Sequence, residues 1–167
     1  MDLLSTLTLV HVVLSLAGIG SGLVVVFGML TARRLDRWTA LFLVTTIATS
    51  ATGFMFPFEH ILPAHGVGLV SLAILGPALA ARYVFQLADG WRRIYVICSV
   101  VALYLNVFVG VFQAFMKIPA LHDLAPTQTE TPFVVAQALT LLIFLALTAA
   151  AVIRFKEQKV LAHGVMR

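Results

Sequence analysis

Charged residues are scarce in this chain of 167 residues. Only 11% of the residues are charged and 61% are hydrophobic, whereas soluble domains carry about 25% charged residues. The mean hydropathy is +1.04. A water-soluble globule is excluded by this composition, because a soluble fold needs far more polar residues to cover its surface.

Cysteine is almost absent too, since Cys98 is the only one. A single cysteine excludes an internal disulfide and a zinc site built from several cysteines. A phosphate-binding glycine loop is also missing, because Gly18, Gly20 and Gly22 alternate inside an apolar run and do not follow a strand. The serines lie inside apolar runs, without the turn motif that exposes a serine nucleophile. No catalytic residue is predicted.

Long uncharged runs take up most of the chain. The 18 charged residues all lie outside five runs, at 3–32, 38–58, 60–81, 94–116 and 131–153. A helix of about 20 mostly apolar residues crosses a bilayer, and a helix pairs its own backbone groups where no water can do so. The runs predict an all-α integral membrane protein of five transmembrane helices, at about 7–30, 38–57, 62–82, 91–116 and 133–154.

The basic residues indicate the orientation of these helices. Ten of the 11 fall on one side if the first helix starts outside, and only Lys117 falls on the other. Because basic loops favour the cytoplasmic side, we expect an amino terminus outside and a carboxyl terminus in the cytoplasm. Residues 1–167 then form a single domain in the inner (plasma) membrane, with an external loop at 117–132. The basic clusters are interpreted as topology anchors, and no nucleic-acid partner is expected.

A stripe of small residues on the first helix predicts close helix packing. Gly18 and Gly22 form a small-xxx-small pair, which lets two helix backbones approach in lipid. Packing within the chain is the favoured interpretation. The expected partners are the lipid bilayer and other membrane subunits, or a second copy that associates through Gly18 and Gly22.

Polar side chains gather toward the outer ends of the predicted helices. Four of the five histidines map to the outer side, and polar side chains in hydrocarbon usually face protein or a cavity. We therefore expect an outer-leaflet cluster that binds a cofactor. Its candidate residues are His11, His65, His60, Glu59, Asn106 and Gln113.

Three ligands are compatible with such a cluster. Haem b would be held between His11 and His65, with phenylalanines 54, 56, 58 and 115 around it. A copper or zinc ion would use histidines with Glu59 or Asp123, and His11 and His65 are the metal candidates in either case. A quinone or similar lipophilic molecule would bond to a histidine, which accepts a proton near neutral pH.

Two functions follow from these alternatives. The first is a redox-associated subunit that binds haem or quinone at the outer histidines. The second is a non-catalytic accessory or assembly subunit of a larger membrane complex, in which the histidines are ordinary interface residues and the amides only bond helices together.

Overall fold

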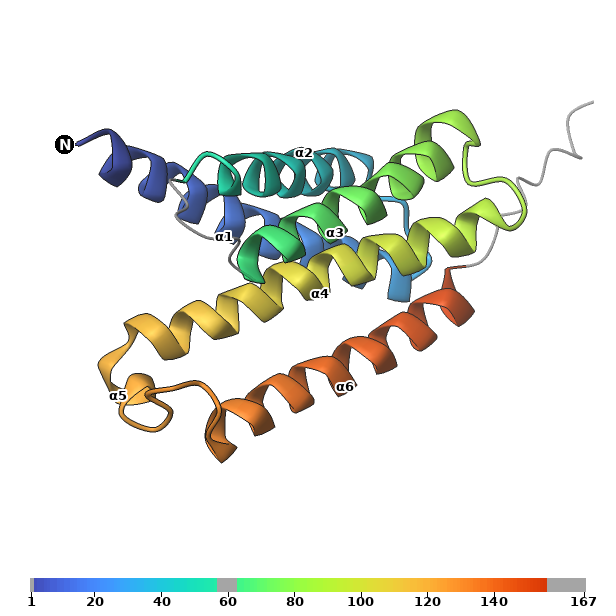
Figure 1. Ribbon diagram of the computed structural model, residues 1–167. Helices are drawn as coiled ribbons and strands as arrows, with labels where there is room; N and C mark the ends of the chain where they lie inside the picture. Colours follow the sequence, from blue (N-terminus) through green and yellow to red (C-terminus); the bar gives the residue numbers. More distant parts are fainter. Residues whose placement is uncertain (1, 57–62, 156–167) are drawn as a thin grey trace, which may run out of the picture.

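The computed structural model describes residues 2–56 and 63–155, and these form helices joined by short turns (Figure 1). The described residues contain no strand. The elements are α1 (Leu3–Leu30), α2 (Asp36–Gly53), α3 (Pro63–Leu79), the π-helix η1 (Ala80–Val84), α4 (Trp91–Lys117), α5 (Pro119–His122) and α6 (Thr131–Arg154). The prediction of an all-helical protein is confirmed.

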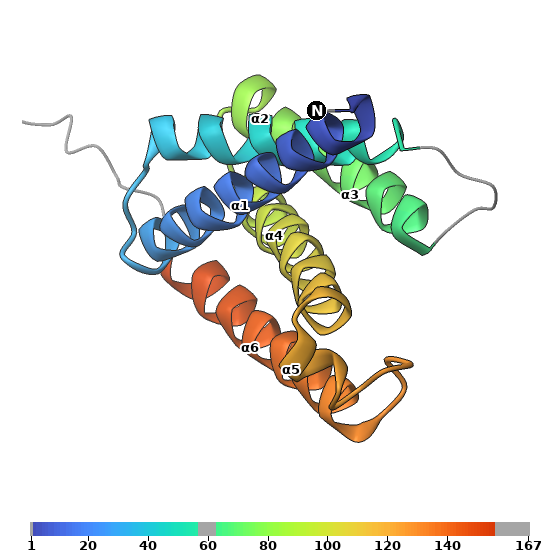
Figure 2. The same ribbon diagram turned by 90° about the vertical axis from the view of Figure 1, so that its left-hand side faces the viewer.

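Helix α4 lies at the centre of the arrangement. It packs against α1, α2, α3, η1 and α6, whereas α6 contacts only α4 and α1 among the described elements. Figures 1 and 2 show α1, α2 and α3 on one side of α4 and α6 on the other. The outer face of α6 is covered by no other helix, and only Phe144 and Ala151 are buried in it.

The bundle has two ends of different composition, which we call the basic end and the histidine end. The basic end comprises the turns at 31–35 and 85–90 and the end of α6 at Arg154. The histidine end comprises the starts of α1, α3 and α6 and the ends of α2 and α4. The buried residues of α1 run only from Gly18 to Met29, so the tight core lies in the middle and toward the basic end.

Four helices are long and apolar enough to cross a membrane. They are Leu3–Leu30, His65–Val84, Trp91–Lys117 and Thr131–Arg154. Helix α2 is shorter and more polar, because it begins with Asp36 and Arg37 and carries five hydroxyl residues in its second half. The membrane prediction is supported for four helices, while the fifth crossing and the orientation of the termini stay predictions.

The hydroxyl residues of α2 face the neighbouring helices. Thr45, Thr46, Thr49 and Ser50 are buried, and the hydroxyls of Thr45 and Ser50 donate to carbonyls three or four residues earlier in α2. These bonds satisfy the hydroxyls of Thr45 and Ser50 inside the helix, while the buried Thr49 Oγ1 has no partner among the described residues. Helix α2 is therefore polar in composition, but much of that polarity is hidden against the neighbouring helices α1, α3 and α4.

Helix α1 fits against α2 and α4 through glycine. A Cβ added to Gly22 would lie 2.6 Å from Leu103 Cδ1 and 2.9 Å from Phe42 Cδ2, and one added to Gly18 would lie 3.2 Å from Asn106 Nδ2. The stripe thus packs within the chain, which was the favoured interpretation. Because these contacts occupy it, an interface with another chain would have to use a different surface.

The third long helix changes its winding after a proline. Pro77 has no amide hydrogen, so the carbonyl of Ala73 loses its usual helical donor. Three residues later the chain forms η1, in which the Phe85 amide donates to the Ala80 carbonyl at 2.9 Å. The wider π-helical turn brings Arg82 into the bundle, where it is buried.

The connection between α4 and α6 is more structured than a plain loop. Within the predicted external loop at 117–132, residues Pro119–His122 form the short helix α5. Pro119 stands in its first turn, where the missing amide hydrogen costs no bond. Ala125 is fully buried, so this connection packs against the bundle.

Candidate functional site

His11 is tied to α2 through its imidazole ring. Its Nδ1 lies 2.9 Å from Thr52 Oγ1. The hydroxyl hydrogen of Thr52 is already committed, because this hydroxyl donates to the carbonyls of Ala48 at 2.8 Å and Thr49 at 3.1 Å. A hydroxyl has one hydrogen and spare lone pairs. His11 Nδ1 must therefore be the donor, which leaves Nε2 as the unprotonated acceptor nitrogen of the neutral ring.

The end of α2 surrounds this imidazole. The Phe56 ring meets it edge-on, with 5.3 Å between ring centroids. Gly53 lies beside it, and a Cβ at this position would come within 3.6 Å of His11 Cε1. His11 itself is half-buried. The ring is held by one hydrogen bond and one aromatic contact.

His65 reaches the same segment from α3. Its ring lies 6.0 Å from the Phe54 ring, at an interplanar angle of 35°. Gly68, one turn further along α3, accommodates Phe54, since a Cβ there would lie 3.3 Å from Phe54 Cζ. The structure thus brings His11 and His65 to two neighbouring phenylalanines, although the two histidines are 54 positions apart in the sequence.

Asn106 lies away from the histidines. It is 8% exposed, and its Nδ2 is 3.4 Å from Thr46 Oγ1, opposite Gly18. Thr46 precedes Thr52 by six residues, which is about 9 Å along a helix. Asn106 therefore bonds α4 to α2 in the middle of the bundle, and its predicted place in the ligand cluster is not reproduced.

Two glutamine side chains each keep a buried oxygen atom without a hydrogen bond. Among the described residues, neither Oε1 of Gln113 on α4 nor Oε1 of Gln137 on α6 has a hydrogen-bond partner. Gln137 Nε2 donates to the Phe108 carbonyl at 3.1 Å, which joins α6 to α4. Gln137 thus lies between α4 and α6, whereas Gln113 lies on the face of α4 that also carries Asn106 and Gly110. Each keeps one carbonyl oxygen without a partner among the described residues, in the half of the bundle near the histidines.

The remaining residues predicted near the cluster are either not described by the structure or lie elsewhere. Glu59, His60 and Phe58 lie outside the described residues. Phe115 does not line a slot beside the histidines, because its ring packs on Phe133 of α6 at 5.4 Å. His122 is exposed on α5.

A metal centre finds limited support in the described ranges. Within 2–56 and 63–155, no three side chains of His, Cys, Asp or Glu lie close enough together to hold an ion. Any copper or zinc site that includes His11 or His65 would need further ligands from the part of the chain that is not described, where Glu59 and His60 lie.

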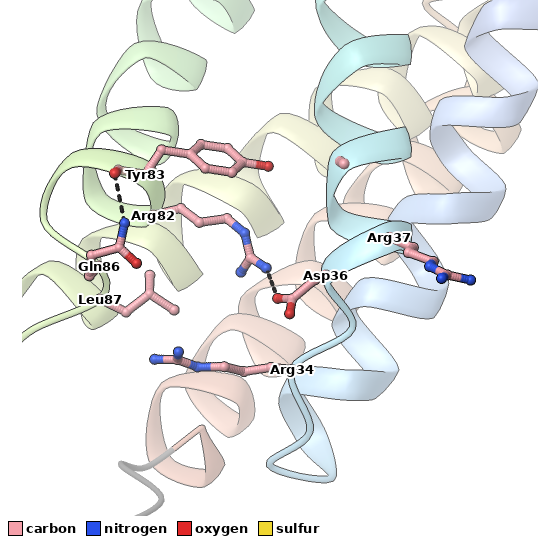
Figure 3. Close-up of a pocket in the computed structure, with 8 residues that line it drawn as sticks. Arg34, Asp36, Arg37, Arg82, Tyr83, Gln86 and Leu87 are labelled. Carbon is pink, nitrogen blue, oxygen red and sulfur yellow. Dashed lines mark hydrogen bonds and ion pairs between the residues drawn. The ribbon is translucent and has the colours of Figure 1, made fainter.

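A second polar centre, which sequence reasoning missed, lies at the basic end. Arg82 of η1 is 8% exposed in its side chain and forms an ion pair with Asp36, the first residue of α2 (Figure 3). Its guanidinium lies 5.4 Å from the Tyr95 ring centroid, and the Tyr95 hydroxyl is 3.2 Å from Thr39 Oγ1. From the sequence, Arg82 is interpreted only as one of the topology anchors. The only signal in the sequence was an arginine directly after a long uncharged run.

Comparison with protein-family models, with curated proteins and with solved structures gave no match to this chain.

Proposed function

We propose that this helical membrane protein binds a quinol or quinone head group at the histidine end, with His11 as the main polar contact. The observation that carries the proposal is the hydrogen bond from His11 Nδ1 to Thr52 Oγ1. It fixes the ring in the tautomer whose Nε2 has a free lone pair. Such a nitrogen accepts a hydrogen bond from the hydroxyl of a quinol.

The surroundings of His11 offer aromatic contacts to a flat ring. Phe54 and Phe56 offer apolar contact beside the two histidines, and aromatic rings pack well edge-on or offset against one another. His65 approaches from α3 as a second imidazole. A lipophilic head group would reach this place from the bilayer, because the start of α1 is largely exposed.

The same geometry favours a quinol over haem. Neutral His11 with its Nδ1–H bonded is a suitable iron ligand in principle. However, each imidazole already contacts a phenylalanine from the segment between the two histidines. A porphyrin between the histidines would have to displace these rings, whereas a quinol needs only one edge of the His11 ring.

The first test measures binding of decylubiquinol to the purified protein in lipid nanodiscs. Loss of one hydrogen bond of about 1.4 kcal/mol corresponds to about a tenfold loss of affinity. We expect this loss in His11→Leu. The matched control is His122→Leu, which removes an exposed histidine at the same end of the bundle. This variant should bind decylubiquinol as tightly as the unmodified protein does.

Two results would contradict the proposal. One is no saturable binding to the unmodified protein, and the other is equal affinity in His11→Leu. Either result would leave the accessory-subunit role as the remaining function from the sequence, with His11 acting only as a bond between α1 and α2.

A further inference from the structure

A cavity among the described residues lies at the basic end, opposite the histidines. Its volume is about 470 Å³, and it opens between the start of α2 and the turn that follows η1 (Figure 3). The lining residues are Arg34, Asp36, Arg37, Ala40, Arg82, Tyr83, Gln86 and Leu87. Three of these eight are arginines.

The cavity carries an excess of positive charge. Asp36 is its only acidic lining residue and forms its one described ion pair with Arg82. Among the described residues, Arg34 therefore has no carboxylate partner. Figure 3 shows the Arg34 side chain extending from the loop before α2 toward Leu87, while Arg37 points away from the Arg82–Asp36 pair. Arg34 and Arg82 are the two cations that a bound anion would meet.

Arg82 is held rigidly for this role. Its side chain is 8% exposed, while that of Asp36 is 76% exposed. The guanidinium lies against the Tyr95 and Tyr83 rings, at 5.4 and 5.8 Å from their centroids. Burial weakens the competition from water, so that a fixed guanidinium is a strong partner for phosphate oxygens.

The turn beyond Arg82 completes the wall in an unusual backbone conformation. Gln86 and Leu87 have φ values of 50° and 59°, in the left-handed region that residues other than glycine seldom adopt. Leu87 is nevertheless 2% exposed, and its carbonyl accepts a hydrogen bond from Arg92 Nη2 at 3.1 Å. Such strain persists only where neighbouring contacts fix the turn.

Aromatic residues indicate that the cavity lies at the depth of lipid head groups. Trp91 stacks on Phe85 directly after the turn, with centroids 3.8 Å apart, and Trp38 and Tyr83 are half exposed. Tryptophan and tyrosine concentrate where the hydrocarbon meets the head groups. Val84 is 70% exposed next to the cavity, so acyl chains have an apolar surface there.

We propose that this cavity binds a phosphate group, with Arg34 and Arg82 as its cationic contacts. An anionic lipid head group and free phosphate share this chemistry. Basic pockets between transmembrane helices are suited to anionic head groups, and the position beside the exposed Val84 favours the lipid. The site is independent of the histidine end, so the failure of one proposal leaves the other unchanged.

The test is native mass spectrometry of the full chain, titrated with phosphatidylglycerol, with phosphatidylcholine or with inorganic phosphate. We expect saturable binding of phosphatidylglycerol, and weaker binding of phosphatidylcholine, whose choline cancels the charge. Removing one cation near the membrane surface costs about a fivefold loss of affinity, which we expect for Arg34→Gln. Arg34→Gln changes an exposed loop residue and leaves Arg82 in place, so the fold should be kept.

Two further variants make the result specific. Asp36→Asn removes the carboxylate that competes for Arg82, so phosphatidylglycerol should bind about fivefold more tightly. Arg154→Gln removes a basic residue at the same end that does not line the cavity, and binding should not change. Saturable binding of inorganic phosphate without binding of phosphatidylglycerol would identify free phosphate as the occupant. The proposal is overturned if neither phosphatidylglycerol nor phosphate binds, or if Arg34→Gln and Arg154→Gln have equal effects.

Discussion

The hydrogen bond between His11 and Thr52 decides what the histidine can do. The Thr52 hydroxyl donates its one hydrogen to α2 carbonyls, so it acts only as an acceptor toward His11. In a neutral ring with Nδ1 as the donor, Nε2 is the only position open to a ligand. A threonine in the second half of α2 therefore sets the chemistry of a residue on α1.

Replacing Thr52 with valine tests this assignment, because valine keeps the shape and removes the acceptor. We expect the imidazole ¹⁵N spectrum of His11 to show the Nδ1–H form in the unmodified protein and a mixture of tautomers in Thr52→Val. The spectrum of His122 serves as the control, since it lies on exposed α5. An unchanged His11 spectrum would contradict the assignment.

For single residues, the sequence indicated which side chains lie at the histidine end better than it indicated which side chains they contact. It identified His11 and His65 as residues of one cluster, and the structure brings both to the end of α2. It placed Asn106 in the same cluster, whereas in the structure Asn106 faces Thr46 about two turns deeper. The difference comes from the rotation of each helix about its axis, which depends on close contacts such as Gly18 against Asn106.

Among the elements, α1 gives the sharpest test of packing, because it has two glycines with opposite surroundings. A Cβ on Gly22 would overlap the fully buried side chains of Leu103 and Phe42, which would have to shift, whereas one on Gly20 would meet nothing within 4 Å. We expect Gly22→Ala to destabilise the protein by about 1–3 kcal/mol. Gly20→Ala should be neutral or slightly stabilising. Reversible unfolding in mixed micelles measures both, and equal effects would contradict this packing.

The segment before α6 gives a prediction about pH. Glu130 accepts hydrogen bonds from the Thr127 hydroxyl at 2.8 Å, the Thr127 amide at 3.1 Å and the Thr129 amide at 3.0 Å. Desolvation raises the pKa of Glu130, but these hydrogen bonds outweigh it and hold the pKa below the ordinary value of 4.5. Because the folded pKa is the lower one, the stabilisation is present above about pH 4.5 and is lost as the pH falls through the folded value.

Amide NMR shifts of Thr127 and Thr129 report this titration directly. We expect both to move together with a midpoint below 4.5, and to lose this transition in Glu130→Gln. Asp123→Asn, which changes an exposed acidic residue in the same connection, should leave the transition in place. A midpoint at or above 4.5 would show that these hydrogen bonds are not formed in solution.

The sequence predicted where the long helices begin and end better than it predicted the short helical segments between them. The expected helix at 91–116 is observed as Trp91–Lys117, because charge ends the apolar run on both sides. The short helix α5 and the π-helical turn η1 were not predicted. Both depend on local backbone hydrogen bonding after a proline, and neither changes the hydropathy pattern from which the helices were recognised.

For the whole molecule, the arrangement of the helices makes a prediction about topology. Helix α2 runs back along α1 (Figure 1), as the predicted five crossings require, although α2 is not one of the four helices that are long and apolar enough to span a membrane. The turn at 86–89 and the connection at 123–130 should then face opposite sides of the membrane. The positive-inside bias places the first in the cytoplasm.

Single-cysteine labelling in intact cells tests this arrangement, and it is practical because only Cys98 must first be replaced, for example by Cys98→Ser. We expect Gln128→Cys to react with a membrane-impermeant maleimide from outside. Gln86→Cys should react only after permeabilisation. The reverse pattern would overturn the orientation, and reaction of both from the same side would overturn the five crossings.

The π-helical turn at Ala80–Val84 also affects how this chain tolerates changes in length. A π turn holds one residue more than an α turn, so deleting one residue from it would restore regular winding without breaking the helix. Every side chain before the deletion would then rotate by about 100° relative to those after it. Because Arg82 and the Gln86–Leu87 turn lie on this boundary, a one-residue deletion here should leave a folded membrane protein in which the arginine no longer meets Asp36.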